Sequence, residues 1–230
     1  MTTELWDAAY AQGFDRDTPP AELVTAKLVP VIKALIEDGT LQDAACLDIG
    51  TGAGKNLPPL LEVGFTRIDA VDISRAGLRM AAARLKGIPG EQSVRFWQGD
   101  FVHDFAAAVP PAAQYAAALA IHTFHANREA THQGIRQATQ YVMPGGVFAL
   151  CTAAALRKGI LAEGNVQVWP DGGYTTYADN GLPVHALAET ELRELLEPEM
   201  QLVSGLGYRE ATINEGRTVA EWATIWQALA

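Results

Sequence analysis

The chain has 230 residues and a mass of 24.6 kDa, a length that favours one enlarged domain over two. Apolar residues make up 49% and charged residues 19% of the sequence, which excludes a disordered chain or a coiled coil and predicts a soluble globular protein. The formal net charge of -10 leaves no cationic excess for a phosphate backbone, so a nucleic-acid partner is disfavoured.

The first 40 residues predict an N-terminal helical cap. A short helix is expected over residues 3–12, and a second helical pattern over 21–37, which Pro30 splits or kinks. Glu4 and Asp7 interrupt the apolar stretch that a signal peptide would need, and no run of 18 apolar residues occurs. The sequence therefore predicts a cytoplasmic protein without a membrane partner.

From residue 44 onward, strand-like and helix-like segments alternate, a pattern that builds a parallel sheet with helices on both faces. We expect Ser74 and Asn127 to cap two of the helices, the second of which stops at residues 144–146. The expected strands are residues 45–49, 67–72, 94–100, 115–120 and 147–151.

The C-terminal third begins with a stretch, residues 159–187, that is rich in glycine, proline and aromatic residues and has no sustained period. Such a segment inside a domain is more often a lid or binding loop than a linker, although a surface loop pinned by its aromatic residues is the alternative. Thr190 is expected to cap a short helix that ends at Pro198. Two strands, over 200–208 and 217–226, complete a single domain spanning residues 1–230.

The most informative stretch is residues 46–56, CLDIGTGAGKN, in which an apolar strand opens through three alternate glycines into a helix. Glycine allows a backbone to approach a ligand closely. A phosphate-binding P-loop fails on spacing, because Ile49 and Asn56 stand where glycine and Ser or Thr are required. A dinucleotide fingerprint fails because Lys55 stands where Gly or Ala is required.

Three aspartates end successive predicted strands: Asp48, Asp72 and Asp100. The carboxyl ends of parallel strands form the ligand crevice of open α/β sheets. Asp48 would repel a pyrophosphate by roughly 3 kcal/mol at about 5 Å, whereas a phosphate-free adenosyl ligand avoids this cost. Asp72 can accept from ribose hydroxyls and Asp100 from an adenine amine. Each aspartate alone is more often a helix cap or a turn residue, but three in this order favour a nucleoside site.

The sequence resembles the class I S-adenosylmethionine-dependent methyltransferases from about Trp6 to the C-terminus. The matching motifs are LDIGTGAGKN, AVDIS, QGDF and MPGGVFALC. The opening, with Trp6, Asp7, Tyr10 and Gly13, is similar to the small-molecule branch that includes tellurite-resistance and thiopurine methyltransferases. The resemblance implies a doubly wound, seven-stranded, mostly parallel α/β sheet with an antiparallel C-terminal strand, S-adenosylmethionine as cofactor and S-adenosylhomocysteine as product.

The resemblance also implies which residues hold the cofactor. The glycines would lie against its methionine part, Asp48 near its amino group, Asp72 on the ribose and Asp100 beside the adenine. The full expected set is Asp48, Gly50, Gly52, Gly54, Asp72, Ile73, Asp100, Phe101 and Ala120.

The two cysteines, Cys46 and Cys151, lie in apolar runs outside any CxxC motif or Cys/His cluster, so they are predicted to be buried thiols. No metal site is predicted. In the resembling fold the first and fifth strands are not neighbours, so a disulfide between the two cysteines is not expected.

On the acceptor side, His122 follows the fourth strand and should face the methyl group. It is the first candidate for a base, if one is needed, and His125 is the second; a pocket wall or hydrogen-bond donor is the alternative role for His122. Trp6 and Tyr10 share a helix face that could close over the ligands or pack. Trp169 and Tyr174 are expected to line the acceptor pocket from the lid-like insertion.

The sequence departs from parts of the family pattern. The fourth strand begins Tyr115-Ala116 where an aromatic-Asp pair is common, and it lacks the Asn or Asp followed by Pro-Pro of amino-methylating nucleic-acid enzymes. We therefore expect a monomeric or homodimeric enzyme that methylates a small molecule by in-line transfer. A non-catalytic adenosyl-binding protein and a NAD-linked oxidoreductase remain as alternatives.

Overall fold

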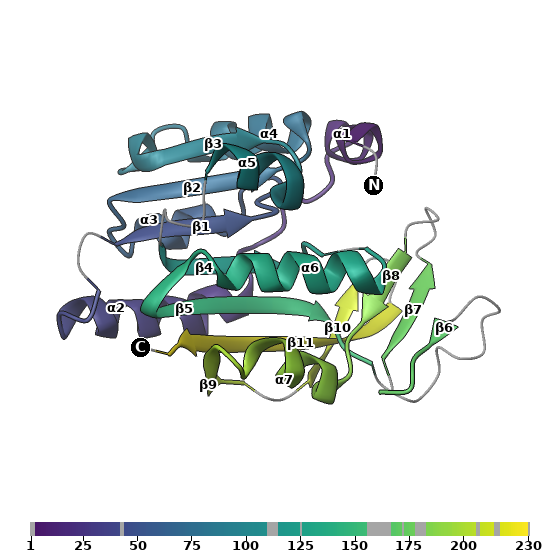
Figure 1. The fold of residues 1–230 in the computed structure, drawn as a ribbon. Coiled ribbons are helices and arrows are strands. Elements are labelled where there is room, and N and C mark those ends of the chain that lie inside the picture. The colour runs from purple at the N-terminus through teal and green to yellow at the C-terminus, as the bar shows by residue number, and fades with distance from the viewer. Residues whose placement is uncertain are drawn as a thin grey trace.

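The computed structural model of the chain (Figure 1) describes residues 3–41, 44–109, 115–124, 126–155, 167–171, 173–177, 183–205, 208–213 and 217–229. The α-helices are α1 (Thr3–Ala11), α2 (Val29–Glu37), α3 (Leu57–Leu61), α4 (Arg75–Leu85), α5 (Ala106–Ala108), α6 (Arg128–Thr139) and α7 (Glu189–Leu196). Shorter or wider helical turns are η1 (Leu23–Leu28), η2 (Glu91–Ser93) and η3 (Phe101–Phe105). None of the described helices is long and apolar enough to cross a membrane.

The main sheet runs in the order β10-β11-β5-β4-β1-β2-β3, and β9 also pairs with β11. Its strands are β1 (Ala45–Ile49), β2 (Arg67–Asp72), β3 (Val94–Gln98), β4 (Tyr115–Ile121), β5 (Val142–Ala153), β9 (Met200–Ser204), β10 (Tyr208–Ile213) and β11 (Arg217–Ala228). The first five are parallel, whereas β11 is antiparallel to β5. Strand order reverses between β1 and β4, which confirms the predicted doubly wound α/β fold.

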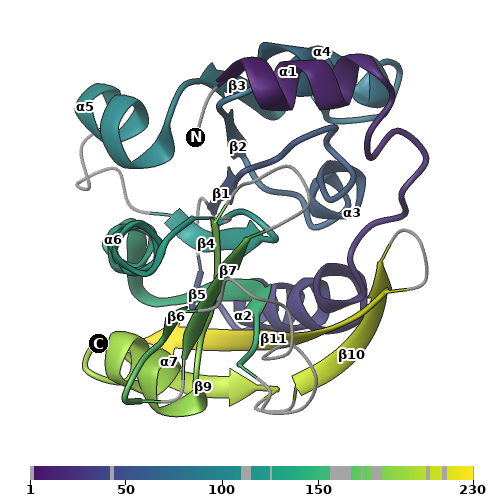
Figure 2. The ribbon, with the colours of Figure 1, turned by 90° about the vertical axis from the view of Figure 1, so that its right-hand side faces the viewer.

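Helices bury both faces of this sheet, as Figures 1 and 2 show. Leu47 and Ile49 of β1 face one core, which α6 and α7 complete. Cys46 of the same strand points to the opposite face of the sheet. It belongs to the other core, which η1, α2, α3 and α4 complete. Because strand side chains alternate between faces, a strand covered on both sides must be apolar throughout. This requirement explains the unbroken apolar run of β4 and the apolar residues that precede Asp48 in β1.

Several predicted helix boundaries are confirmed. Ser74 accepts from Gly77 N (3.0 Å) and Asn127 accepts from Ala130 N (3.0 Å), so both cap their helices. Pro30 stands in the first turn of α2, directly after the wide turn η1, so the segment divides at this proline as predicted. A proline is tolerated there because the first-turn N–H has no intrahelical partner.

Other boundaries differ from the prediction. α7 begins at Glu189 with Ala188 as its N-cap, so the predicted cap at Thr190 is wrong; the carboxylate of Glu191 accepts from Ala188 N (3.3 Å) instead. α6 ends at Thr139, and residues 144–146 lie within β5 rather than ending the helix. The predicted strand over 200–208 is divided between β9 and β10, both of which pair with β11.

The insertion over 159–187 is not structureless where the structure describes it. It contributes a second, three-stranded sheet formed by β6 (Gln167–Val168), β7 (Tyr174–Tyr177) and β8 (Pro183–Ala186), paired antiparallel. The strands are too short to show a period of two in the sequence. The structure brings this sheet beside α6 and the end of β5 (Figure 1).

Candidate functional site

The glycine loop after β1 lies at the point where the strand order reverses. Gly50, Gly52 and Gly54 have φ values of +69°, +55° and +72°, which side chains rarely adopt. The loop is held against the end of β2, because Gly50 N and Thr51 N both donate to Val71 O, at 2.8 and 3.0 Å. The three glycines therefore fix a tight, left-handed path directly above the sheet.

Neighbouring elements approach these glycines closely. A Cβ on Gly50 would lie 2.4 Å from the side chain of Thr123, which follows β4. A Cβ on Gly52 would lie 2.4 Å from the Tyr10 hydroxyl, and one on Gly54 2.7 Å from Ala81 of α4. Gly54 thus allows α4 to pack closely on the loop. Gly50 and Gly52 allow the segment after β4 and helix α1, respectively, to contact the loop.

Asp48 is buried inside the loop at 1% exposure. Its Oδ2 accepts a hydrogen bond from Thr51 Oγ1 at 2.7 Å. Burial raises the pKa of Asp48 to about 6, against the opposing effect of the Thr51 hydrogen bond. At neutral pH this carboxylate is mostly ionised, which favours a cationic group and disfavours a phosphate nearby.

Asp72, at the end of β2, joins the loop to α4. Its Oδ2 accepts from Gly52 N at 2.8 Å, and its Oδ1 accepts from Ser74 N at 2.7 Å. Burial raises the pKa of Asp72 in spite of these hydrogen bonds. Asp72 thus ties the glycine loop to the start of α4 at the carboxyl end of β2, and Ile73 follows it directly.

Asp100 and Phe101, after β3, lie at the same edge but have partners of their own. Asp100 Oδ1 caps η3 by accepting from Val102 N (2.8 Å) and His103 N (3.0 Å). Phe101 is 7% exposed and stacks on Phe105, with 5.7 Å between ring centroids. Asp100 is thus a helix cap, which is the structural alternative for any aspartate at a strand end. Phe101 is a packing residue in this structure.

The helix α1 lies alongside α4 and over the loop (Figure 2). The rings of Trp6 and Tyr10 are in tilted contact, with 6.1 Å between their centroids, as their shared helix face predicts, and Tyr10 is 7% exposed. Asp7 fixes this arrangement, because its Oδ1 accepts from Ser74 Oγ (2.6 Å) and Ala76 N (2.9 Å) at the start of α4. In the sequence, only the place of Asp7 between Trp6 and Tyr10 hinted at this role.

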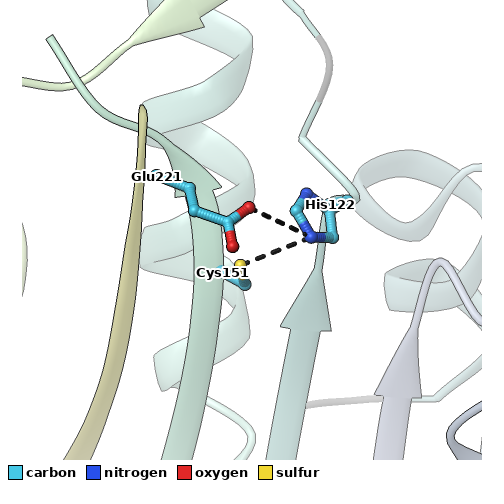
Figure 3. Close-up of side chains that lie close together, drawn as sticks. All are labelled: His122, Cys151 and Glu221. Atoms are coloured by element: carbon cyan, nitrogen blue, oxygen red, sulfur yellow. Dashed lines mark hydrogen bonds and ion pairs between the residues drawn. The ribbon is translucent and has the colours of Figure 1, made fainter. Parts of the chain in front are cut away.

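His122 follows β4 with a φ of +55°, an uncommon backbone conformation for a residue other than glycine. Its backbone N donates to Cys151 O at 2.9 Å. Its ring Nε2 lies 3.3 Å from Glu221 Oε2 and 3.5 Å from Cys151 Sγ (Figure 3). We call His122, Cys151 and Glu221 the His122 cluster. Non-glycine residues held at positive φ concentrate at functional sites.

The His122 cluster is next to the glycine loop. Thr123, the next residue, donates from Oγ1 to Ile49 O at 2.6 Å and packs on Gly50. Ala120 is fully buried in β4. His125, the second candidate base, lies outside the described residues. The structure therefore places His122 at the carboxyl end of β4, one residue from the Thr123 that packs on the glycine loop.

Two members of the His122 cluster were missed by the sequence analysis. Cys151 and Glu221 are 0% and 1% exposed, on β5 and β11. Cys151 is buried and forms no disulfide, as predicted, but it lies beside a histidine, which was not predicted. Only Glu221, a carboxylate inside the apolar run RTVAEWATIW, offered a signal, since buried carboxylates need a partner.

A second cluster lies between the insertion and helices α6 and α7. We call Arg128, His132, His185 and Glu191 the Glu191 cluster. Glu191 Oε1 accepts from Arg128 Nε (2.7 Å) and lies 2.5 Å from His132 Nε2 and 2.9 Å from His185 Nε2. Burial acts to raise the pKa of Glu191, but the hydrogen bonds from the two histidines and the arginine outweigh it and lower the pKa well below its ordinary value.

The aromatic residues predicted for the acceptor pocket lie in the insertion. The Arg128 guanidinium is 4.7 Å from the Trp169 ring centroid, and Arg128 also pairs with Asp171. Trp169 borders an open hollow of about 720 Å³ along α6. Trp169 is thus placed with the Glu191 cluster, and not among the described contacts of His122. Tyr174 belongs to β7, and its side chain lies outside the described residues.

Comparison with known proteins shows a family match for part of the chain and a shared fold. The family model of the methyltransferase domain matches residues 46–146, from β1 through the glycine loop into β5. This segment thus matches the methyltransferase-domain family, and the fold is that of solved class I S-adenosylmethionine-dependent methyltransferases. The cofactor of such a methyltransferase is S-adenosylmethionine. A search of curated protein sequences gives no match.

Solved methyltransferases share the fold at low sequence identity. A 1,6-didemethyltoxoflavin-N1-methyltransferase from Burkholderia thailandensis is 19% identical with a TM-score of 0.63, over 99% of this chain and 87% of that one. The N-methyltransferase NodS from Bradyrhizobium japonicum is 12% identical with a TM-score of 0.64, over 98% of this chain and 97% of NodS. TehB from Haemophilus influenzae is 17% identical with a TM-score of 0.60, over 98% of this chain and 67% of TehB.

Proposed function

We propose that this methyltransferase transfers a methyl group to a small-molecule acceptor in the crevice between the ends of β1 and β4. The observation that carries the proposal is Asp72, which accepts one hydrogen bond on each carboxylate oxygen, from Gly52 N in the glycine loop and from Ser74 N at the start of α4. An ionised carboxylate offers about four lone-pair sites. Asp72 can therefore keep the loop in place and still accept from two ribose hydroxyls.

The remaining cofactor contacts are proposed from the same edge. Asp48 supplies negative charge for a cationic amino group, and Gly50 and Gly52 hold the left-handed loop path against which the methionine part would lie. When bound, S-adenosylmethionine supplies a sulfonium methyl group: as the acceptor's lone pair bonds to the methyl carbon, the carbon–sulfur pair returns to sulfur and S-adenosylhomocysteine leaves. The proposed cofactor set is Asp48, Gly50, Gly52, Gly54, Asp72, Ile73, Asp100, Phe101 and Ala120.

On the acceptor side, His122 is the proposed residue at which the acceptor is activated, and Trp6 and Tyr10 of α1 are proposed to cover the crevice. Holding the reacting groups in line contributes roughly 7 to 11 kcal/mol in well-oriented reactions. Trp169 and Tyr174 are proposed to act through the insertion as a lid. The domain is proposed to be one unit, cytoplasmic, and monomeric or homodimeric.

Two observations support a small acceptor. The net charge of -10 opposes binding to a nucleic acid. The similar Burkholderia structure holds 1,6-didemethyltoxoflavin together with S-adenosylhomocysteine.

Calorimetric titration tests the proposal. S-adenosylhomocysteine should bind the wild-type chain and NAD should not. Asp72→Asn should weaken binding at least about tenfold, because hydrogen bonds to a charged group are worth about 1.5 to 3 kcal/mol. Asp38→Asn, at an exposed carboxylate after α2, is the matched control and should bind as the wild type does. NAD binding without S-adenosylhomocysteine binding would contradict the proposal, and binding without methylation of any acceptor in a broad panel would point to a binding protein.

A further inference from the structure

Three side chains of metal-ligating types converge at the carboxyl end of β4, from within or directly after three different strands of the main sheet (Figure 3). His122 follows β4, Cys151 is on β5 and Glu221 is on β11. These strands are hydrogen-bonded neighbours, with Cys151 opposite Ile121 of β4, and Glu221 opposite Ala153 of β5. A site carried by central strands is held more rigidly than one carried by loops.

The distances within the His122 cluster match a tetrahedral metal site. With metal–ligand lengths of about 2.0 to 2.1 Å for nitrogen, 2.3 Å for sulfur and 2.0 to 2.2 Å for oxygen, a tetrahedral site has nitrogen–oxygen edges of about 3.3 Å and nitrogen–sulfur edges of about 3.5 Å. The observed separations are 3.3 Å from Nε2 to Oε2 and 3.5 Å from Nε2 to Sγ. All three ligand atoms lie within 4.8 Å of one another.

We propose that His122, Cys151 and Glu221 bind a divalent transition metal of the Zn²⁺ type. Imidazole, thiolate and carboxylate are the ligands this ion takes in proteins, and three protein ligands with one open position are typical of catalytic zinc. Cys151 and Glu221 are buried, whereas the side chain of His122 is 37% exposed. The open position therefore lies on the His122 side, toward the crevice.

This inference rests on the proposed function, because the acceptor is the fourth ligand. A bound metal lowers the pKa of a coordinated hydroxyl or thiol, so the acceptor releases its proton to water and presents an anionic nucleophile. The acceptor class is accordingly narrowed to a small alcohol, phenol or thiol. His122 then activates the acceptor as a metal ligand rather than as a free base.

The Glu191 cluster has similar residue types but does not suit a metal. Its nitrogen–oxygen separations of 2.5 and 2.9 Å are hydrogen-bond lengths. Arg128 Nε lies 2.7 Å from the same carboxylate oxygen, and this fixed positive charge opposes a second cation. The comparison isolates the His122 cluster as the metal site among the described residues.

The experiment is a Co²⁺ titration of the chelator-treated full chain. We expect visible bands of tetrahedral Co²⁺ and a near-ultraviolet thiolate-to-cobalt band, both saturating at one ion per chain. Cys151→Ser should remove the thiolate band. Glu221→Gln and His122→Asn should weaken Co²⁺ binding at least about tenfold, given that even outer-shell changes cost 10- to 100-fold. Asparagine is chosen at position 122 because it tolerates positive φ.

Three matched controls should bind Co²⁺ as the wild type does: His103→Asn and Glu189→Gln, at exposed positions, and His132→Asn in the Glu191 cluster. A thiolate band that survives Cys151→Ser, or a loss of Co²⁺ binding in His132→Asn, would overturn the assignment. Arg209 is opposite Glu221 in the β10–β11 register. A Co²⁺ band that develops only in Arg209→Gln would also overturn it, because the arginine would then neutralise Glu221 in the native chain.

Titration of S-adenosylhomocysteine on the same preparations separates the two proposals and reports folding of each variant. Binding of S-adenosylhomocysteine without any Co²⁺ band overturns the metal site and leaves the proposed function standing. A Co²⁺ band in a chain that does not bind S-adenosylhomocysteine overturns the proposed function instead.

Discussion

The two histidine–carboxylate clusters differ in how their charges are compensated. In the Glu191 cluster, one carboxylate oxygen accepts from an arginine and faces two histidine nitrogens at 2.5 to 2.9 Å. In the His122 cluster, the histidine stands 3.3 and 3.5 Å from its carboxylate and thiol partners and carries a positive φ. By residue type alone, both clusters would be candidate metal sites. The short distances in the Glu191 cluster are those of hydrogen bonds, which make it a structural clamp, whereas the longer distances in the His122 cluster leave room for an ion.

The largest expected effect that separates them is on stability. Glu191→Gln should lower the free energy of unfolding by about 3 kcal/mol, because it leaves the partly buried Arg128 without its main partner. Glu189→Gln, on the same helix but exposed, should change it by no more than about 0.5 kcal/mol. Urea denaturation measures both. Equal effects in the two variants would mean that the Glu191 cluster is not a clamp.

A somewhat smaller effect, on catalysis alone, is expected in the other cluster. His122→Asn should lower kcat/KM for methyl transfer about a hundredfold, which corresponds to about 2.7 kcal/mol, because the acceptor is no longer activated. S-adenosylhomocysteine affinity should be preserved. Steady-state kinetics with the matched variant His103→Asn check this, and a His122→Asn enzyme with wild-type turnover would remove this cluster from the reaction.

The pH dependence of stability sharpens the comparison further. The pKa of Glu191 is lower in the folded chain than its ordinary value of 4.5. Its contribution is therefore fully present above that value and is lost as the pH falls below it. The difference in unfolding free energy between wild type and Glu191→Gln should shrink between neutral pH and pH 3. The contribution of Asp48 to the pH dependence of stability is the same in both proteins and cancels in this difference. Its raised pKa would otherwise change the stability in the opposite direction. A constant difference would contradict the assigned hydrogen bonds.

The smallest expected effect concerns the contact between the insertion and the clamp. Trp169→Leu should lower stability by about 0.5 to 1 kcal/mol, the usual value of an exposed cation–π contact such as that with Arg128. If the insertion acts as a lid, the same variant should raise the KM for the acceptor. An unchanged KM would leave the insertion with a structural role only.

Much of the cofactor edge could be predicted because its signals are local. An apolar strand, a left-handed glycine turn and a capping serine are properties of a few consecutive residues, so Gly50, Gly52 and Ser74 lie where the sequence places them. Local signals mislead where longer-range partners compete: Thr190 is a good cap in isolation, but Glu191 reaches back to Ala188 N and sets the helix start.

The sequence by itself determined the alternation of strands and helices and the positions of the loop and its aspartates, because backbone conformation and periodicity act over short distances. Only the tertiary structure decided that Cys151 and Glu221 meet His122, and that Glu191 meets Arg128. Those residues are far apart along the chain and share no spacing. Strand order and the packing of the insertion on α6 bring them together, and neither is encoded in any single segment.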